Sequence, residues 1–193
     1  MKQVLCLIGL AALPMAAQAQ QEAGRGFNYT FVDVGYVDVE SDLGAAEVDG
    51  DGLQLRGAVD LTDRLYLTGD YTDLDHEGPV ETSTLGVGVG LHHRLQSDLD
   101  LIGELTWVNL EVDTPFGDAD DDGFGLAVGL RYRANSDVEL EGAIRHVDLD
   151  DSNTLLDLRG RYYLNPSFAL AGGLLIDSGD LGWTIGIRAD FGR

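Results

Sequence analysis

Cysteine and lysine are nearly absent from this sequence. The only cysteine is Cys6 and the only lysine is Lys2, so every other basic residue is an arginine. A chain whose first residues are removed would have no thiol and no disulfide, and it must be held together in another way. No segment beyond the first twenty residues has the sustained apolar period of a helix, which argues against a helical fold.

Positive charge is also scarce. Twelve basic residues stand against 34 acidic ones, which gives a formal net charge of −22. Nucleic acids bind basic surfaces through their phosphates, so the composition excludes a nucleic-acid partner.

The amino terminus has the pattern of a secretory signal. Met1-Lys2 provides a short positive start, an apolar stretch runs from Val4 to Ala17, and Ala17-Gln18-Ala19 is a small-x-small cleavage site. The apolar stretch is too short to span a bilayer as a helix. We expect a signal peptide at residues 1–19 and a single domain at residues 20–193.

One pattern occurs four times, each time after a short polar turn. The pattern is apolar, any, Leu, any, Gly, any, apolar, and its copies are 65–71, 99–105, 138–144 and 168–174. Apolar residues recur at every second position in each copy, which is the period of a β-strand.

The segments between these copies alternate in the same way, so the whole chain predicts an all-β protein. We predict ten strands at 27–40, 52–62, 64–75, 82–95, 98–112, 122–134, 137–149, 153–164, 167–177 and 181–191. An even number lets the first and last strands pair and close the sheet, with eight strands as the alternative. The expected fold is a transmembrane up-and-down antiparallel β-barrel, with short turns at one end and longer loops at the other, including one at 113–121.

The second face of the strands indicates a membrane barrel rather than a soluble one. It combines small residues with arginine, which suits a crowded lumen better than a solvated surface. The arginines in this register are Arg56, Arg94, Arg131, Arg133, Arg145, Arg159, Arg161 and Arg188. The acidic candidates for pairing with them are Asp60, Asp70, Glu104, Glu139, Glu141, Asp157 and Asp190. An arginine that faced lipid at the bilayer midplane would cost about 2–4 kcal/mol.

By these features the chain resembles the small outer-membrane β-barrel proteins of Gram-negative bacteria, which include outer-membrane protein A/X-like and porin-like members. The opening segment 27–37 resembles the first strand of a porin-like subgroup that is also found in outer-membrane vesicles. The resemblance implies a monomer in the bacterial outer membrane, in contact with lipid and lipopolysaccharide. It also implies that the barrel-assembly machinery recognises the last strand, here Trp183, Ile185, Ile187 and Phe191.

An acidic segment contains the start of a calcium-loop pattern. Asp118, Asp120 and Asp122 alternate and Gly123 follows, but position twelve would be Gly129 instead of glutamate. A complete EF-hand is therefore excluded. Loose binding of Ca²⁺ or Mg²⁺ by these aspartates is the alternative to a solvated acidic loop, and no other cofactor is expected.

Nothing in the sequence assembles a catalytic site. His76 lies among acidic residues, as in some outer-membrane proteases, but those enzymes have much longer strands, and no other feature matches. We therefore expect a structural or surface-interaction protein with a charged, largely filled lumen. Two alternatives stay open: a narrow porin-like channel for small solutes or ions, and an adhesin or divalent-cation-binding barrel that acts through acidic outer loops.

Overall fold

The structure is a computed structural model that describes residues 26–42, 47–76, 78–150, 152–177 and 180–192. The expected signal peptide lies outside the described residues.

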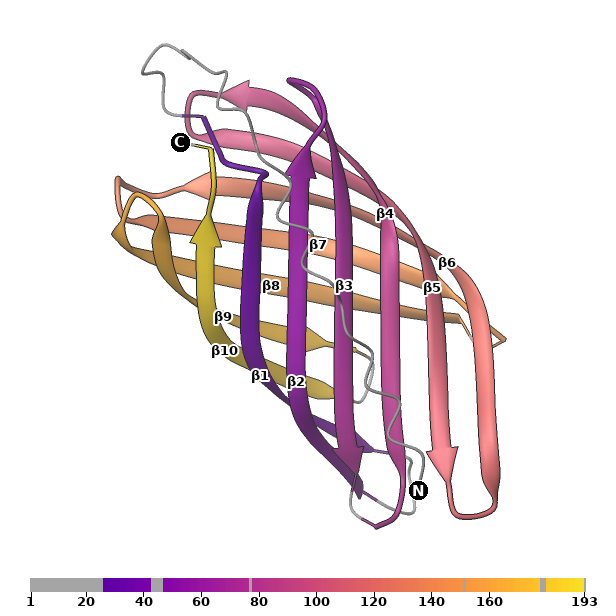
Figure 1. The fold of residues 1–193 in the computed structure, drawn as a ribbon. Helices are drawn as coiled ribbons and strands as arrows, with labels where there is room; N and C mark the ends of the chain where they lie inside the picture. Colours follow the sequence, from indigo (N-terminus) through magenta and orange to yellow (C-terminus); the bar gives the residue numbers. More distant parts are fainter. Residues whose placement is uncertain (1–25, 43–46, 77, 151, 178–179, 193) are drawn as a thin grey trace.

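Ten antiparallel strands form a closed barrel (Figure 1). They are β1 (Phe31–Asp42), β2 (Glu47–Asp60), β3 (Leu65–His76), β4 (Glu81–Gln96), β5 (Leu99–Thr114), β6 (Gly117–Arg133), β7 (Val138–Asp148), β8 (Ser152–Asn165), β9 (Phe168–Ile176) and β10 (Leu181–Asp190). Each strand pairs with its neighbours along the chain, and β1 pairs with β10 to close the ring. The prediction of an up-and-down barrel is confirmed, with ten strands rather than eight.

The alternating apolar residues point away from the barrel axis. Leu53, Phe124, Ile144 and Ile185 are each more than 60% exposed, and similar residues surround the whole barrel. A soluble protein does not expose an apolar surface of this extent, so the belt is the surface that meets lipid. Within the described residues there is no helix long and apolar enough to cross a membrane.

Two ends of the barrel can be distinguished. We call the end that carries the C-terminus and the β2–β3, β4–β5, β6–β7 and β8–β9 turns the terminal end, and the opposite end the distal end. The terminal end is at the top of Figure 1.

Strand length differs greatly around the ring. β9 and β10 have 9 and 10 residues, whereas β5 and β6 have 16 and 17. About 9–11 residues suffice to cross a bilayer as a tilted strand. The surplus of β5 and β6 therefore continues past the bilayer at the distal end.

This surplus corrects one prediction. The expected loop at 113–121 is almost entirely strand, because β5 ends at Thr114 and β6 begins at Gly117. The acidic residues had suggested a loop, yet a strand beyond the lipid is solvated and accepts them freely. Here the distal end extends beyond the lipid through longer strands and not through a longer loop.

A second correction concerns the first strand. Residues 27–30 were expected to belong to it, but β1 begins only at Phe31. Asn28, Tyr29 and Thr30 are buried instead. They turn into the lumen at the terminal end, where side chains of the barrel wall provide their polar contacts.

Candidate functional sites in the lumen and at the distal end

Arginines and carboxylates fill the lumen. Seven of the eight predicted arginines form ion pairs with six carboxylates in three separate groups, and together we call these residues the lumen network. The lumen network consists of Arg56, Arg131, Arg133, Arg145, Arg159, Arg161, Arg188, Asp33, Glu104, Glu139, Glu141, Asp157 and Asp190.

Glu139 is the most enclosed carboxylate of the lumen network. It is 1% exposed and accepts hydrogen bonds from Arg131 Nε and Nη2 at 3.1 and 2.7 Å. Arg133 binds its other oxygen, Oε1. A buried carboxylate in this position is stabilised only while both guanidinium groups remain.

Other members bridge strands that are far apart in the ring. Arg56 on β2 reaches Glu104 on β5 at 3.3 Å and Glu141 on β7 at 3.5 Å. Arg161 on β8 binds the second oxygen of Glu141 at 2.9 Å, and Arg145 binds Glu104 at 3.2 Å. These pairs cross the lumen, so its middle section is occupied by side chains.

Three predicted members are placed differently. The side chain of Arg94 is 55% exposed at the terminal end, 3.9 Å from Asp100. Asp60 is exposed and is hydrogen-bonded to Thr30 rather than to an arginine. Asp70 lies directly across from Arg56 in the sheet, but Arg56 extends to the opposite wall instead. Neither Asp60 nor Asp70 forms an ion pair among the described residues.

The structure adds members that the sequence interpretation missed. Asp33 lies 3.6 Å from Arg188, which is fully buried and also binds Asp190. Asp100 is 1% exposed and accepts a hydrogen bond from Tyr29. Both aspartates stand between outward-facing apolar residues, so the alternation itself places them inside. They could have been found by applying it to every strand.

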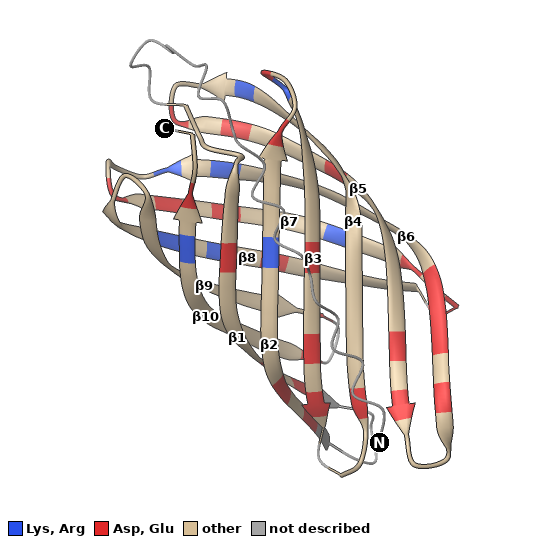
Figure 2. Cartoon of the chain, in the orientation of Figure 1, with Lys and Arg blue, Asp and Glu red and all other residues tan. Residues whose placement is uncertain are grey.

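The lumen is close to electrically neutral. The eight predicted arginines share its inner face with ten inward-facing carboxylates: Asp33, Asp60, Asp70, Asp100, Glu104, Asp121, Glu139, Glu141, Asp157 and Asp190. This balance leaves two negative charges, against −22 for the whole chain. Nearly all of the net charge therefore lies elsewhere, and Figure 2 shows acidic residues gathered at the distal ends of the strands.

Residual space in the lumen is small. A cavity of about 30 Å³ lies beside the lumen network and is lined by residues that include Asp33, Gln54, Arg159, Arg161 and Thr184. It has room for water but not for a sugar or an amino acid.

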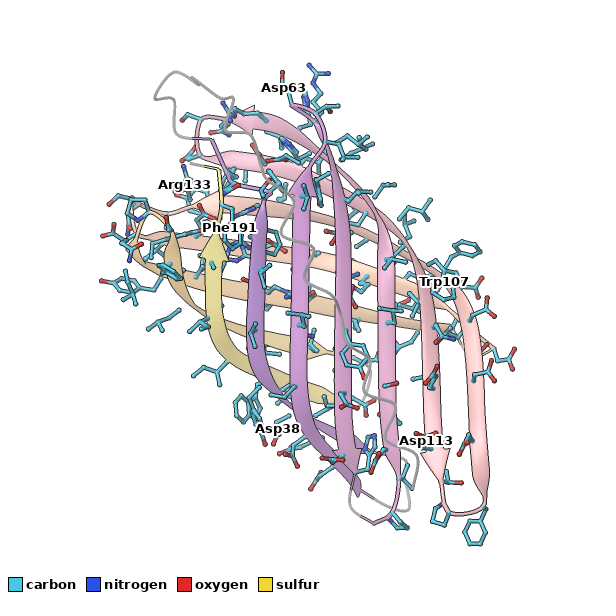
Figure 3. The ribbon with its side chains drawn as sticks, in the orientation of Figure 1. Asp38, Asp63, Trp107, Asp113, Arg133 and Phe191 are labelled. Carbon is cyan, nitrogen blue, oxygen red and sulfur yellow. The ribbon has the colours of Figure 1, made fainter. Side chains whose placement is uncertain are left out.

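On the outer surface, the apolar belt ends abruptly on β5 and β6. Trp107 and Phe124 are directly paired and face outward. The outward positions beyond them are polar or acidic: Asn109, Glu111 and Asp113 on β5, and Asp118, Asp120 and Asp122 on β6. Figure 3 shows Trp107 part-way along β5 and Asp113 near its distal end. The change marks where the barrel leaves the lipid.

Beyond this boundary, outward carboxylates oppose one another on successive strands. Asp38 pairs with Asp51, Asp51 with Asp75, Asp75 with Glu81, Glu81 with Asp113, and Asp113 with Asp118. We call these six residues the acidic band. It runs around β1 to β6, and each of its members faces a like charge directly across the sheet, an arrangement that is destabilising unless counterions compensate.

Aromatic residues at the boundary donate hydrogen bonds to nearby carboxylates. The hydroxyl of Tyr36 donates to Asp51 at 3.0 Å, and Trp107 Nε1 donates to Asp122 at 3.4 Å. Such residues suit an interface because their rings are apolar and their polar atoms stay accessible.

The three aspartates of the calcium-loop pattern do not converge on one point. Asp118, Asp120 and Asp122 occupy alternate positions of β6, where neighbouring side chains on one face stand about 7 Å apart. Among the residues that the structure describes, no three acidic, histidine or cysteine side chains are arranged to hold a metal ion. His76 faces inward and contacts Thr82 at 2.8 Å, whereas Asp73 and Asp75 face outward, so they form no joint site.

The residues expected to guide assembly lie on the closing strand. Trp183, Ile185 and Ile187 face outward on β10, with exposures of 40, 61 and 60%. Phe191 follows the end of β10, and its backbone N–H donates to Thr30.

Comparisons with known proteins agree with this architecture. Residues 4–158 match the family described as "Outer membrane protein beta-barrel domain". No curated protein sequence matches the chain.

Solved structures with a similar fold include Ail, the attachment invasion locus protein of Yersinia pestis. It is 12% identical, with 86% of this chain and 100% of that chain covered and a TM-score of 0.46. OprG of Pseudomonas aeruginosa is 11% identical, with coverage of 88% and 99% and a TM-score of 0.48. The N-terminal barrel domain of OprF from the same organism is 12% identical, with coverage of 86% and 100% and a TM-score of 0.44. These values describe a resemblance of fold and carry nothing about activity.

Proposed function

The chain belongs to the outer membrane protein β-barrel family, and from that premise we propose that it is a non-conducting barrel whose working surface is its distal end. The terminal end then faces the periplasm and the distal end faces outward. The role is structural or interactive and not enzymatic.

The lumen network is the observation that carries this proposal. Its ion pairs cross the barrel from β2 to β5 and β7, and Arg131, Arg188 and Glu139 are at most 1% exposed. A ten-stranded barrel has an interior close to what side chains can fill. A solute would have to separate buried ion pairs to pass, which costs several kcal/mol for each ion left unpaired.

Single-channel recording in planar bilayers tests this proposal. We expect no conductance steps above the protein-free background, whereas a general porin reconstituted in the same way serves as the positive control. Regular steps from the wild-type barrel would contradict the proposal and favour the narrow porin-like channel.

The acidic band favours a second function, which is contact with lipopolysaccharide through shared divalent cations. The band begins where the apolar belt ends, at the level where the phosphates of lipopolysaccharide lie. Its opposed carboxylates and those phosphates repel each other unless cations lie between them. The cations would be shared between protein and lipid, not held in a closed protein site.

The test compares thermal midpoints in vesicles with and without lipopolysaccharide, in Mg²⁺ and after chelation. We expect Mg²⁺ to raise the midpoint most in lipopolysaccharide, and the Glu81→Gln/Asp113→Asn variant to lose most of that gain. Asp148→Asn is the matched control, because Asp148 faces Phe124 and Ser152 and has no opposed carboxylate. An unchanged Mg²⁺ response in the double variant would exclude this function.

A further inference from the structure

The segment Gly26–Thr30 spans the lumen at the terminal end. It directly precedes β1, yet it contacts β4, β5 and β6, and in a ring of ten strands β6 stands opposite β1. Figure 3 shows Arg133 and Phe191 at this end. The segment therefore extends over the mouth of the lumen toward β4, β5 and β6.

Three arginines bind the backbone of this segment. The carbonyl oxygen of Asn28 accepts hydrogen bonds from Arg131 Nη1 at 2.9 Å and Arg188 Nη2 at 3.0 Å. The carbonyl oxygen of Gly26 accepts one from Arg133 Nη2 at 3.1 Å. Because these bonds involve charged donors, they are stronger than ordinary amide contacts.

Tyr29 fills the space beneath these bonds. Its ring stacks on His92 at 4.0 Å and on Tyr66 at 4.9 Å, and its hydroxyl donates to Asp100 at 3.0 Å. It is 4% exposed and belongs to the buried apolar cluster of the lumen, with Phe31, Ala58, Tyr66 and Ile102. An aromatic ring held from three sides closes this mouth of the barrel.

Withdrawal of the segment would leave none of the three arginines without a carboxylate partner. Arg131 and Arg133 keep Glu139, and Arg188 keeps Asp190 and Asp33. The paired ladders of the ten strands begin at Phe31, so the strand pairing that closes the wall does not use residues 26–30. Asn28 and Thr30 hydrogen-bond to Phe191 just past the end of β10, and withdrawal would release these two bonds. The contacts are thus those of an inserted plug on a wall that is complete without it.

We propose that Gly26–Thr30 is an intramolecular plug, and that its withdrawal opens the lumen to water from the terminal end as far as the lumen network. The non-conducting state proposed above does not depend on this plug, because the ion pairs of the lumen network still cross the barrel.

Cysteine labelling of plug variants tests the proposal. In one variant Phe27→Gly, Asn28→Ser and Tyr29→Gly are combined, and in another Tyr29→Ala stands alone. The matched control is Tyr132→Ala, because Tyr132 faces outward on β6 and is 42% exposed. We expect both plug variants to expose the lumen beneath the plug to water and the control to leave it buried.

The reporter is a single cysteine placed beneath the plug. Ala58→Cys, buried beneath the plug, is expected to react with a small water-soluble maleimide about tenfold faster or more when combined with Tyr29→Ala, because reactivity follows local opening. The Tyr132→Ala combination should react at the rate of Ala58→Cys alone.

The outcomes separate this proposal from the one above. Conductance of the wild type against a protein-free bilayer tests the non-conducting barrel, whereas the ratio of labelling rates between plug variant and wild type tests the plug. Plug variants that fold, as shown by heat-modifiable migration, but leave the labelling of Ala58→Cys at its rate in the unaltered barrel would overturn it. Failure of both plug variants to fold would overturn it as well, because the proposal requires a wall that is complete without the plug.

Discussion

At the scale of single residues, small side chains on the inner face decide which large ones fit. Tyr66 stands directly across from Gly90, is 2% exposed and donates a hydrogen bond to Glu104 at 3.0 Å. A Cβ built on Gly90 would overlap the ring of Tyr66. The glycine is therefore needed for its lack of a side chain and not for an unusual backbone angle.

Gly90→Ala is expected to lower the free energy of unfolding by about 1–3 kcal/mol, because the tyrosine ring must move in a filled lumen. Urea unfolding in detergent micelles measures the change. Gly103→Ala is the control, since its Cβ would face outward with its nearest neighbour, the Ala127 oxygen, at 3.8 Å. A cost for Gly90→Ala no larger than that of the control would contradict the interpretation.

The ion pairs of Glu139 predict a larger loss in the free energy of unfolding than Gly90→Ala. Glu139→Gln leaves Arg131 and Arg133 without their shared negative partner, and we expect a loss of about 3 kcal/mol or more in the same assay. Glu111→Gln, at an exposed position of the distal end, should change the free energy little. A loss below about 1 kcal/mol for Glu139→Gln would show that the buried ion pair contributes little.

The sequence predicts the position of a side chain well where the neighbours along the chain determine which face of the strand it occupies. Arg131 and Glu139 follow from alternation alone, because both lie between outward-facing apolar neighbours. The partner of Arg56 could not be inferred this way. Its sheet neighbour is Asp70, but its long side chain reaches carboxylates on the opposite wall, and only the closed ring brings those within range.

At the scale of elements, the ends of strands were harder to predict than their existence. Phe27, Tyr29 and Phe31 alternate as a strand would, although only Phe31 belongs to one. In the acidic segment 113–121 the error is the opposite, because strand continues where a loop was expected. Both errors arise because alternation reports which face a residue occupies and not whether lipid, water or a filled lumen lies on that face.

The distal part of the β5–β6 hairpin should therefore be dispensable for folding. Replacing residues 111–120 with Asn-Gly, a pair suited to a two-residue hairpin turn, is expected to leave the barrel folded, with heat-modifiable migration retained. The matched control removes four residues from each strand inside the apolar belt, 101–104 and 127–130, and should abolish folding because the apolar part of each strand becomes too short to cross the lipid. Loss of folding in the distal deletion would contradict the assignment of this region to the outside of the lipid.

At the scale of the whole molecule, the alternation of apolar residues along the chain predicts one property best, which is the closure of the sheet into a barrel. All ten strands are paired on both sides, so no strand edge remains open to lipid. Such a barrel should resist detergent at room temperature. We expect unboiled and boiled samples to migrate differently on denaturing gels, and the protein to require detergent for extraction. Identical migration, or solubility without detergent, would contradict the membrane barrel.

Because of the acidic band, negative charge at the distal end is also distributed unevenly around the barrel axis. Its opposed carboxylates run from β1 to β6, whereas β8, β9 and β10 end at the distal side in outward residues such as Ser152, Ile176 and Leu181. Rotation about the membrane normal therefore changes what the protein presents to a lateral neighbour. A second barrel that approaches from the β1–β6 side meets a dense negative surface, while one that approaches from β8–β10 meets fewer carboxylates, among them Asp177 and Asp180. In a crowded leaflet, the lateral contacts of the molecule therefore depend on how it is rotated about the membrane normal.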